Sequence, residues 1–239
     1  MDSVTGMIYK RMQRAVLGVL WMVLLVVVLA GCEAEPSAVG TSSAKAPSKS
    51  AVEGTIVALG DSLTAGLGVR EEKAYPAVLG EKLKANGYAY QVVNAGVSGE
   101  TSSGALSRLE WIVSSLNPDI VILETGANDG LRGIDPKLLE ANLDEICTRL
   151  KEKKIEILLA GMQMLPNLGP DYTSAFSSIY PRIARKHNLV FMPFMLEEVA
   201  GNPSLNQPDR LHPTAEGYAK IVENIYPFVL QTIERHRSK

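Results

Sequence analysis

Three residues of this chain could together carry out nucleophilic catalysis: Ser62, His212 and Asp209. A serine hydroxyl attacks a carbonyl carbon only when a base removes its proton, and histidine accepts and returns a proton near neutral pH. A carboxylate three residues before the histidine could fix the imidazole ring and stabilise its charged form. These residue types therefore predict acyl transfer, with Ser62 as the nucleophile, His212 as the base and Asp209 as the partner of the base.

Each of these residues also has a purely structural interpretation. Ser62 follows a short apolar segment and could be a helix cap, a position that serine often takes. His212 precedes Pro213 and could be an ordinary loop histidine ahead of a helix. His187 and His236 are predicted to be structural, the first at a helix end and the second in the polar C-terminal tail. Whether Ser62 and His212 are catalytic or structural depends on which other residues lie beside them in the fold.

From residue 52 onwards, short apolar runs alternate with segments of helical spacing. The apolar runs predict buried strands at 55–59, 90–94, 119–124, 155–160 and 189–192. Helical spacing and end signals predict helices at 75–86, 101–116, 135–153, 172–187 and 213–235. This alternation predicts a three-layer α/β/α fold around a five-stranded, mostly parallel sheet.

In such sheets the ligand site lies beyond the carboxyl ends of the strands. The segments that follow the first three predicted strands are rich in glycine and short polar residues. The backbone N–H groups of Ser62 and Gly99 and the side-chain amide of Asn128 could stabilise an oxyanion there, with Gly96 as an alternative to Gly99. The glycine patterns of nucleotide sites are absent from the sequence, which disfavours a nucleotide site. The G-x-S-x-G elbow is also absent, which disfavours the α/β-hydrolase fold.

These segments resemble the sequence blocks of the SGNH hydrolases, also called the GDSL esterases. In chain order, the blocks are Gly60-Asp-Ser-Leu63, Asn94-Ala-Gly-Val-Ser-Gly99-Glu-Thr101, Gly126-Ala-Asn128-Asp129 and Asp209-Arg-Leu-His212-Pro213. The resemblance covers about 54–232 and is closest to the bacterial thioesterase, lysophospholipase and arylesterase group. It implies a flavodoxin-like SGNH hydrolase fold and an enzyme that cleaves carboxylic esters or thioesters. It also implies a triad of Ser62, His212 and Asp209, with no metal or cofactor.

Two details of the resemblance concern the oxyanion site and the substrate. The asparagine block often reads Gly-Gly-Asn-Asp, and Ala127 in place of the second glycine is tolerated only if its φ is not positive. The segment after the fourth predicted strand resembles the loop that lines the acyl site in this group. The resemblance therefore implies that Leu165, Pro166 and Leu168 contact an acyl chain, although a plain rigid loop fits the same residues.

Composition constrains the partners and leaves two alternatives. A formal net charge of −2 excludes a global basic field for nucleic acid. A carbohydrate O-acetyl esterase with the same catalytic residues is disfavoured, because 6% aromatic residues offer little for stacking on sugars. A non-catalytic, lipid-binding lipoprotein is disfavoured because every candidate catalytic residue is present. Cys32 and Cys147 predict no disulfide framework, and three scattered histidines predict no metal site.

The N-terminal segment predicts an exported bacterial lipoprotein. Basic residues precede an apolar run over 15–31, which is shorter than the roughly 20 residues of a membrane span. The run ends in Leu29-Ala30-Gly31-Cys32, which matches a lipobox. We expect a signal peptide over 1–31, a lipid on Cys32, a flexible tether over 32–51 and a hydrolase domain over 52–239 on the periplasmic or extracytoplasmic side. An uncleaved N-terminal helix is the alternative.

Overall fold

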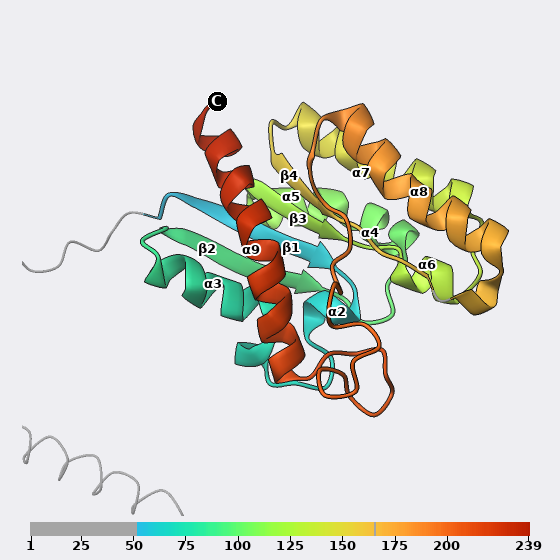
Figure 1. The fold of residues 1–239 in the computed structure, drawn as a ribbon. Coiled ribbons are helices and arrows are strands. Elements are labelled where there is room, and N and C mark those ends of the chain that lie inside the picture. Colours follow the sequence, from blue (N-terminus) through green and yellow to red (C-terminus); the bar gives the residue numbers. More distant parts are fainter. Residues whose placement is uncertain (1–51, 165) are drawn as a thin grey trace, which may run out of the picture. The chain divides into compact units, whose positions relative to one another are not determined.

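A computed structural model provides the fold and describes residues 52–164 and 166–239 (Figure 1). The predicted signal peptide, Cys32 and the predicted tether therefore lie outside the described residues, as does Leu165. Within the described ranges, no helix is both long enough and apolar enough to cross a membrane.

The strands of the described residues form one parallel sheet. In spatial order they are β2 (Tyr90–Gly96), β1 (Gly54–Gly60), β3 (Ile120–Glu124), β4 (Glu156–Ala160) and β5 (Val190–Met192). All four pairings are parallel, so every carboxyl end opens on the same edge of the sheet. The chain leaves β1 in one direction for β2 and crosses back to β3, which makes the carboxyl ends of β1 and β3 the switch point where ligands bind in such sheets.

Helices cover both faces of the sheet, which confirms the predicted three-layer architecture. On one face α3 (Tyr75–Ala85) packs against α9 (Ala215–Arg237), which crosses in front of the strands in Figure 1. The other layer holds α4 (Ser102–Ser107), α5 (Leu109–Leu116), α7 (Pro136–Glu152) and α8 (Pro170–His187). Burial from both sides explains why the strands read as continuous apolar runs.

The helix predicted over 101–116 is the main error in the element predictions. It is two helices, α4 and α5, which meet at Arg108. The break allows the Arg108 guanidinium to reach back to the carbonyl oxygen of Ala95 and the carboxylate of Glu100. A polar side chain in a helical pattern does not reveal such a contact, because its partners lie in the preceding strand and loop.

Smaller differences arise at helix ends and in short turns. The last helix begins at Ala215 instead of Pro213, because the Thr214 hydroxyl caps it by accepting the N–H of Gly217 at 3.2 Å. The structure also contains four short elements that were not predicted as separate helices: α2 (Ser62–Ala65), η1 (Glu71–Lys73), α6 (Ala127–Leu131) and η2 (Pro166–Leu168). Two of them, α2 and α6, follow β1 and β3 directly and therefore stand at the switch point.

Candidate active site

Ser62 is the first residue of α2, directly beyond the carboxyl end of β1. The Asp61 side chain caps this short helix by accepting the N–H of Leu63 at 2.9 Å. Gly60 and Gly96 end the neighbouring strands, and a Cβ on Gly96 would overlap the backbone of Ala65. The two glycines thus allow α2 to lie close against the strand ends, with Ser62 only 8% exposed.

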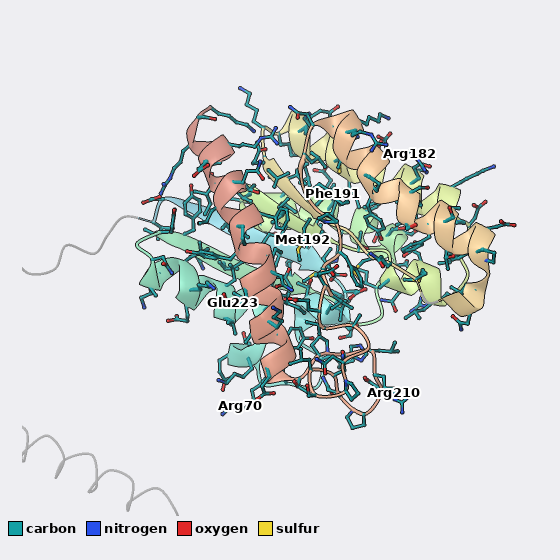
Figure 2. The ribbon with its side chains drawn as sticks, in the orientation of Figure 1. Arg70, Arg182, Phe191, Met192, Arg210 and Glu223 are labelled. Carbon is teal, nitrogen blue, oxygen red and sulfur yellow. The ribbon has the colours of Figure 1, made fainter. Side chains whose placement is uncertain are left out.

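Asp209 and His212 lie in the loop between β5 and α9, where a tight turn joins them. One Asp209 carboxylate oxygen accepts the N–H groups of Leu211 at 2.9 Å and His212 at 3.0 Å. The other lies 2.7 Å from Nδ1 of His212. Arg210 makes the turn possible by adopting a left-handed conformation with φ +62°, and Figure 2 shows it on this loop, below the sheet.

The structure brings the three predicted catalytic side chains into one line of hydrogen bonds. Nε2 of His212 lies 3.0 Å from Oγ of Ser62, although the two residues are 150 positions apart in the sequence. Donation by the backbone N–H of His212, followed by its imidazole and the N–H of Leu211, lowers the pKa of Asp209 to about 2. Asp209 is therefore an anion at neutral pH, suited to hold a histidine that gains a proton.

Gln207 ties the histidine loop to the loop that follows the nucleophile helix. Its side-chain amide donates to the carbonyl oxygens of Leu67 at 2.7 Å and Pro213 at 2.9 Å. Its backbone N–H donates to the carbonyl oxygen of His212 at 2.8 Å. Sequence reasoning missed Gln207, because an amide in a polar loop carries no pattern that distinguishes it.

Asn128 lies in α6, and its amide is held from two sides. The amide nitrogen donates to the Asp61 carboxylate at 3.0 Å and to the carbonyl oxygen of Glu100 at 3.0 Å. The substitution at Ala127 is tolerated, because the positive φ of 112° falls on Gly126 instead. Asn128 is therefore placed next to the cap of the nucleophile helix in spite of the departure from the usual block.

The two candidate glycine donors differ in what their N–H groups contact. The Gly96 N–H donates to the side chain of Asn94 at 3.0 Å. Within the described ranges, the N–H groups of Gly99 and Ser62 have no protein acceptor. Gly99 has a φ of +79°, and its carbonyl oxygen accepts from the Arg132 guanidinium at 2.7 Å. The N–H that is free to meet a ligand is thus that of Gly99.

A polar framework behind these groups holds the glycine loop and α6 together. Arg108 makes a two-pronged ion pair with Glu100, with both nitrogen–oxygen distances at 2.7 Å. The buried Asp129 carboxylate accepts the hydroxyl of Ser102 at 2.5 Å and its N–H at 2.8 Å. Glu100 and Asp129 stand within the sequence blocks, but the sequence predicts no role for them, because their partners are defined only by the folded chain.

Two carboxyl groups lie buried beneath the nucleophile. Burial raises the pKa of Asp61, although its bonds to the Leu63 N–H and the Asn128 amide oppose the rise. Burial also raises the pKa of Glu124, at the end of β3, well above the ordinary glutamate value, and the neighbouring Asp61 raises it further. Neither group was singled out from the sequence, where Glu124 appears only as the polar end of an apolar strand.

The remaining predicted residues lie in other contacts or outside the described ranges. Leu168 is half-buried in η2, Pro166 begins the same short helix, and Leu165 is not described. Their contact with an acyl chain remains a prediction. Nε2 of His187 lies 2.7 Å from the Asp144 carboxylate, and His236 packs edge-on against Tyr90. Both histidines thus make structural contacts away from Ser62.

Known proteins resemble this chain in sequence and in fold. A family model described as the GDSL-like lipase/acylhydrolase family matches residues 58–220. An arylesterase of Vibrio mimicus is 36% identical over 181 residues, which are 76% of this chain and 88% of the relative. The thioesterase 1/protease 1/lysophospholipase L1 of Escherichia coli K12 is 37% identical over 175 residues, 73% of this chain and 83% of the relative. The crystal structure of TesA matches with a TM-score of 0.72 and 37% identity, over 74% of this chain and 99% of that one.

Proposed function

Because this chain belongs to the GDSL-like lipase/acylhydrolase family and is an ester-bond hydrolase, we propose that it cleaves carboxylic esters or thioesters through an acyl-enzyme on Ser62. The observation that carries this proposal is the continuous line from Ser62 Oγ to His212 Nε2 at 3.0 Å and from His212 Nδ1 to Asp209 at 2.7 Å. Nucleophile, base and orienting carboxylate need this order of contacts.

The reaction follows from these contacts in two balanced steps. Ser62 Oγ bonds to the carbonyl carbon while His212 takes its proton, and the alcohol or thiol leaves with that proton. Water then gives a proton to His212 and bonds to the acyl carbon, and the acid leaves as Ser62 regains its proton. Asp209, ionised throughout, stabilises the imidazolium in both steps.

The oxyanion of each tetrahedral intermediate is assigned to the N–H groups of Ser62 and Gly99 and the amide of Asn128. The free N–H groups of Ser62 and Gly99 support this assignment, and the engaged N–H of Gly96 argues against that residue. Both hydrogens of the Asn128 amide already have acceptors, Asp61 and the carbonyl oxygen of Glu100. Asn128 must therefore share one of these hydrogens with the oxyanion as negative charge develops.

Apolar side chains around the site favour an acyl group with hydrocarbon character. Four large apolar residues that follow the carboxyl ends of strands are each 41–49% exposed: Leu67, Val97 and Leu211 in loops, and Leu131 at the end of α6. Leu211 lies within the Asp209–His212 turn, and Leu67 lies in the loop tied down by Gln207. Trp111, in contrast, is on α5 and not on these loops, so it offers no stacking surface for a sugar at the site.

The proposed location follows from the N-terminal sequence. Leu29-Ala30-Gly31-Cys32 supports export as a lipoprotein, anchored to a membrane by the lipid on Cys32 and extracytoplasmic. A lipid with several acyl chains holds a protein at a membrane much more firmly than a single chain.

A panel of substrates tests the proposed function against its alternatives. We expect the full chain to hydrolyse p-nitrophenyl acyl esters and acyl thioesters, and Ser62→Ala to lose this turnover. Exclusive release of acetate from acetylated xylan would instead show the carbohydrate esterase. Absence of turnover on every substrate, by a folded protein, would show a lipid-binding lipoprotein.

A further inference from the structure

The buried group that the proposed reaction leaves unused is Glu124, at the carboxyl end of β3. Its side chain is fully buried, and one carboxyl oxygen, Oε2, accepts the backbone N–H of Asp61 at 3.2 Å and the hydroxyl of Thr64 at 2.8 Å. These contacts attach Glu124 to both ends of the short turn that presents Ser62. A Cβ on Gly60 would overlap Thr64 and approach Oε2 of Glu124 at 2.5 Å, so this glycine leaves the room that the carboxyl occupies.

The other oxygen of Glu124 lacks a bond. Among the described residues, Oε1 is a buried atom without a hydrogen-bond partner. An ionised oxygen in that position would be desolvated without compensation, which is costly in a protein interior. A neutral acid removes this uncompensated charge. Its hydrogen can be shared with the Asp61 side chain, whose hydrogen bond with Glu124 raises the pKa of Glu124, and Oε2 still accepts the two donors it already has.

Asp61, the second carboxyl of the pair, differs from Glu124 in that neither of its oxygens lacks a hydrogen bond. Both of its oxygens accept hydrogen bonds, one from the Leu63 N–H at 2.9 Å and one from the Asn128 amide at 3.0 Å. Two neighbouring buried carboxyls do not both ionise readily, and hydrogen bonds to the charged form decide which of them does. The negative charge is therefore stabilised on Asp61 and not on Glu124.

We propose that Glu124 is a positioning residue that holds one proton as a neutral carboxylic acid and keeps Asp61 as the carboxylate that orients the Asn128 amide. The proposal rests on the proposed function, since it gives the Asn128 amide its role at the oxyanion. Through Asp61, the acid connects the nucleophile turn to the amide. One side chain thus holds two parts of the site at once.

The other titratable groups around Glu124 add no second negative charge. Tyr75 on α3, Tyr180 on α8 and Tyr218 on α9 each interact electrostatically with Glu124, and burial raises the pKa of each phenol above its ordinary value. They remain neutral. His212 interacts electrostatically with Asp61 and favours the ionised form of that residue, not of Glu124.

A stability titration tests where the proton lies, independently of activity. Glutamine is close to a protonated glutamic acid in shape, with one carbonyl oxygen as acceptor and an NH2 group in place of the O–H donor, so Glu124→Gln should fold. The folded wild type retains a proton that the unfolded chain releases near pH 4, at the ordinary glutamate pKa of about 4.3. The wild-type unfolding free energy should therefore fall relative to that of Glu124→Gln as the pH rises above about 4. Urea unfolding of both proteins across that range measures the difference.

The opposite slope, or none, would overturn the proposal. An ionised Glu124 stabilised by its donors has a lowered pKa, and Glu124→Gln would then lose stability relative to wild type as the pH rises. Infrared spectra at neutral pH give a second readout. We expect a carbonyl stretch of a protonated carboxylic acid in the wild type that is lost in Glu124→Gln. A band that persists in Glu124→Gln and disappears in Asp61→Asn would place the proton on Asp61.

Kinetics with matched variants tests the positioning role. Glu124→Leu, which gives Asp61 and Thr64 no acceptor, should lower kcat on the order of 10²-fold, and Glu124→Gln should restore most of it. The kcat of Asp61→Asn should also be low, because the new amide would have to point an N–H group at either the Leu63 N–H or the Asn128 amide N–H. If Asp61→Asn were active and Glu124→Gln were not, the two assignments would be reversed. Failure of the proposed function would leave every variant inactive but would not alter the stability titration.

Discussion

Asp209 shows how a largely exposed carboxylate can be held in a fixed position. Its side chain is 46% exposed, yet three donors from Leu211 and His212 hold both of its oxygens. The turn itself, and not burial, thus fixes the carboxylate and lowers its pKa to about 2. Asp209 therefore stays ionised on mild acidification, and its charge remains available to stabilise the imidazolium.

At the level of single residues, Asn128→Ala tests whether the Asn128 amide stabilises the oxyanion. We expect kcat to fall roughly 10²–10³-fold with little change in KM, because the lost contact forms mainly in the transition state. Steady-state kinetics on a p-nitrophenyl ester measures both constants. Asn86→Ala, at the end of α3, removes an amide that donates to the carbonyl oxygen of Lys82 and serves as a control for a lost amide outside the site. An unchanged kcat in Asn128→Ala would show that the hydrogen bonds of Asn128 to Asp61 and Glu100 are only structural.

At the residue scale, the sequence was sufficient to select Ser62, His212 and Asp209 as candidates because their types and order define the reaction. It was not sufficient for Glu124 or Gln207. A glutamate at the end of an apolar run is typical of a strand end that reaches solvent, and only the folded chain shows that α2 covers it. Contacts between distant segments leave no mark on local spacing.

At the scale of elements, close contact between α2 and the ends of β1 and β2 places the nucleophile. Gly96 permits this contact at β2, whereas a Cβ on Gly80, in the middle of α3, would meet Val92 at 3.6 Å, an ordinary van der Waals distance. Replacement of glycine by alanine should therefore have opposite effects on stability at Gly96 and Gly80.

We expect Gly96→Ala to destabilise the protein by about 1–3 kcal/mol, because its methyl group would overlap the backbone of Ala65 and push α2 away. Gly80→Ala should stabilise it by roughly 0.5–1 kcal/mol, since alanine is the better helix former. Chemical denaturation of both variants tests the pair. Equal effects would mean that the approach of α2 to β2 does not depend on Gly96.

Strands and long helices were predictable because burial and end signals are local. The helix predicted from residue 135, for example, begins at Pro136 with Asp135 as its cap. The break at Arg108 and the short helix α6 were not predictable. Each is set by side chains that bond to another part of the chain, Arg108 to Glu100 and Asn128 to Asp61.

At the scale of the whole molecule, the alternation of strands and helices predicted a parallel sheet with its site at the carboxyl edge. It did not give the strand order, in which β1 lies between β2 and β3. That order places the nucleophile turn after β1 between the glycine loop after β2 and the amide on α6 after β3. Three blocks that are distant in sequence thereby become one site.

The proposed anchor makes a separate prediction for the whole molecule. Cys32→Ser should move the protein from the detergent phase to the aqueous phase in a phase-partitioning assay, because it removes the residue that would carry the lipid. Turnover of a soluble ester should be unchanged, since each proposed catalytic residue lies at or beyond Ser62. Partitioning of Cys32→Ser like the wild type would contradict lipidation at this cysteine.

Covalent labelling tests the assignment of Ser62 as nucleophile most directly. A fluorophosphonate reacts with a serine that a base has activated, and peptide mass spectrometry locates the adduct. We expect a single adduct on Ser62 of the folded protein, lost in Ser62→Ala and strongly slowed in His212→Ala. Ser102, whose hydroxyl donates to Asp129, should remain unlabelled. An adduct on Ser98 or Ser102, or undiminished labelling of Ser62→Ala, would contradict the account.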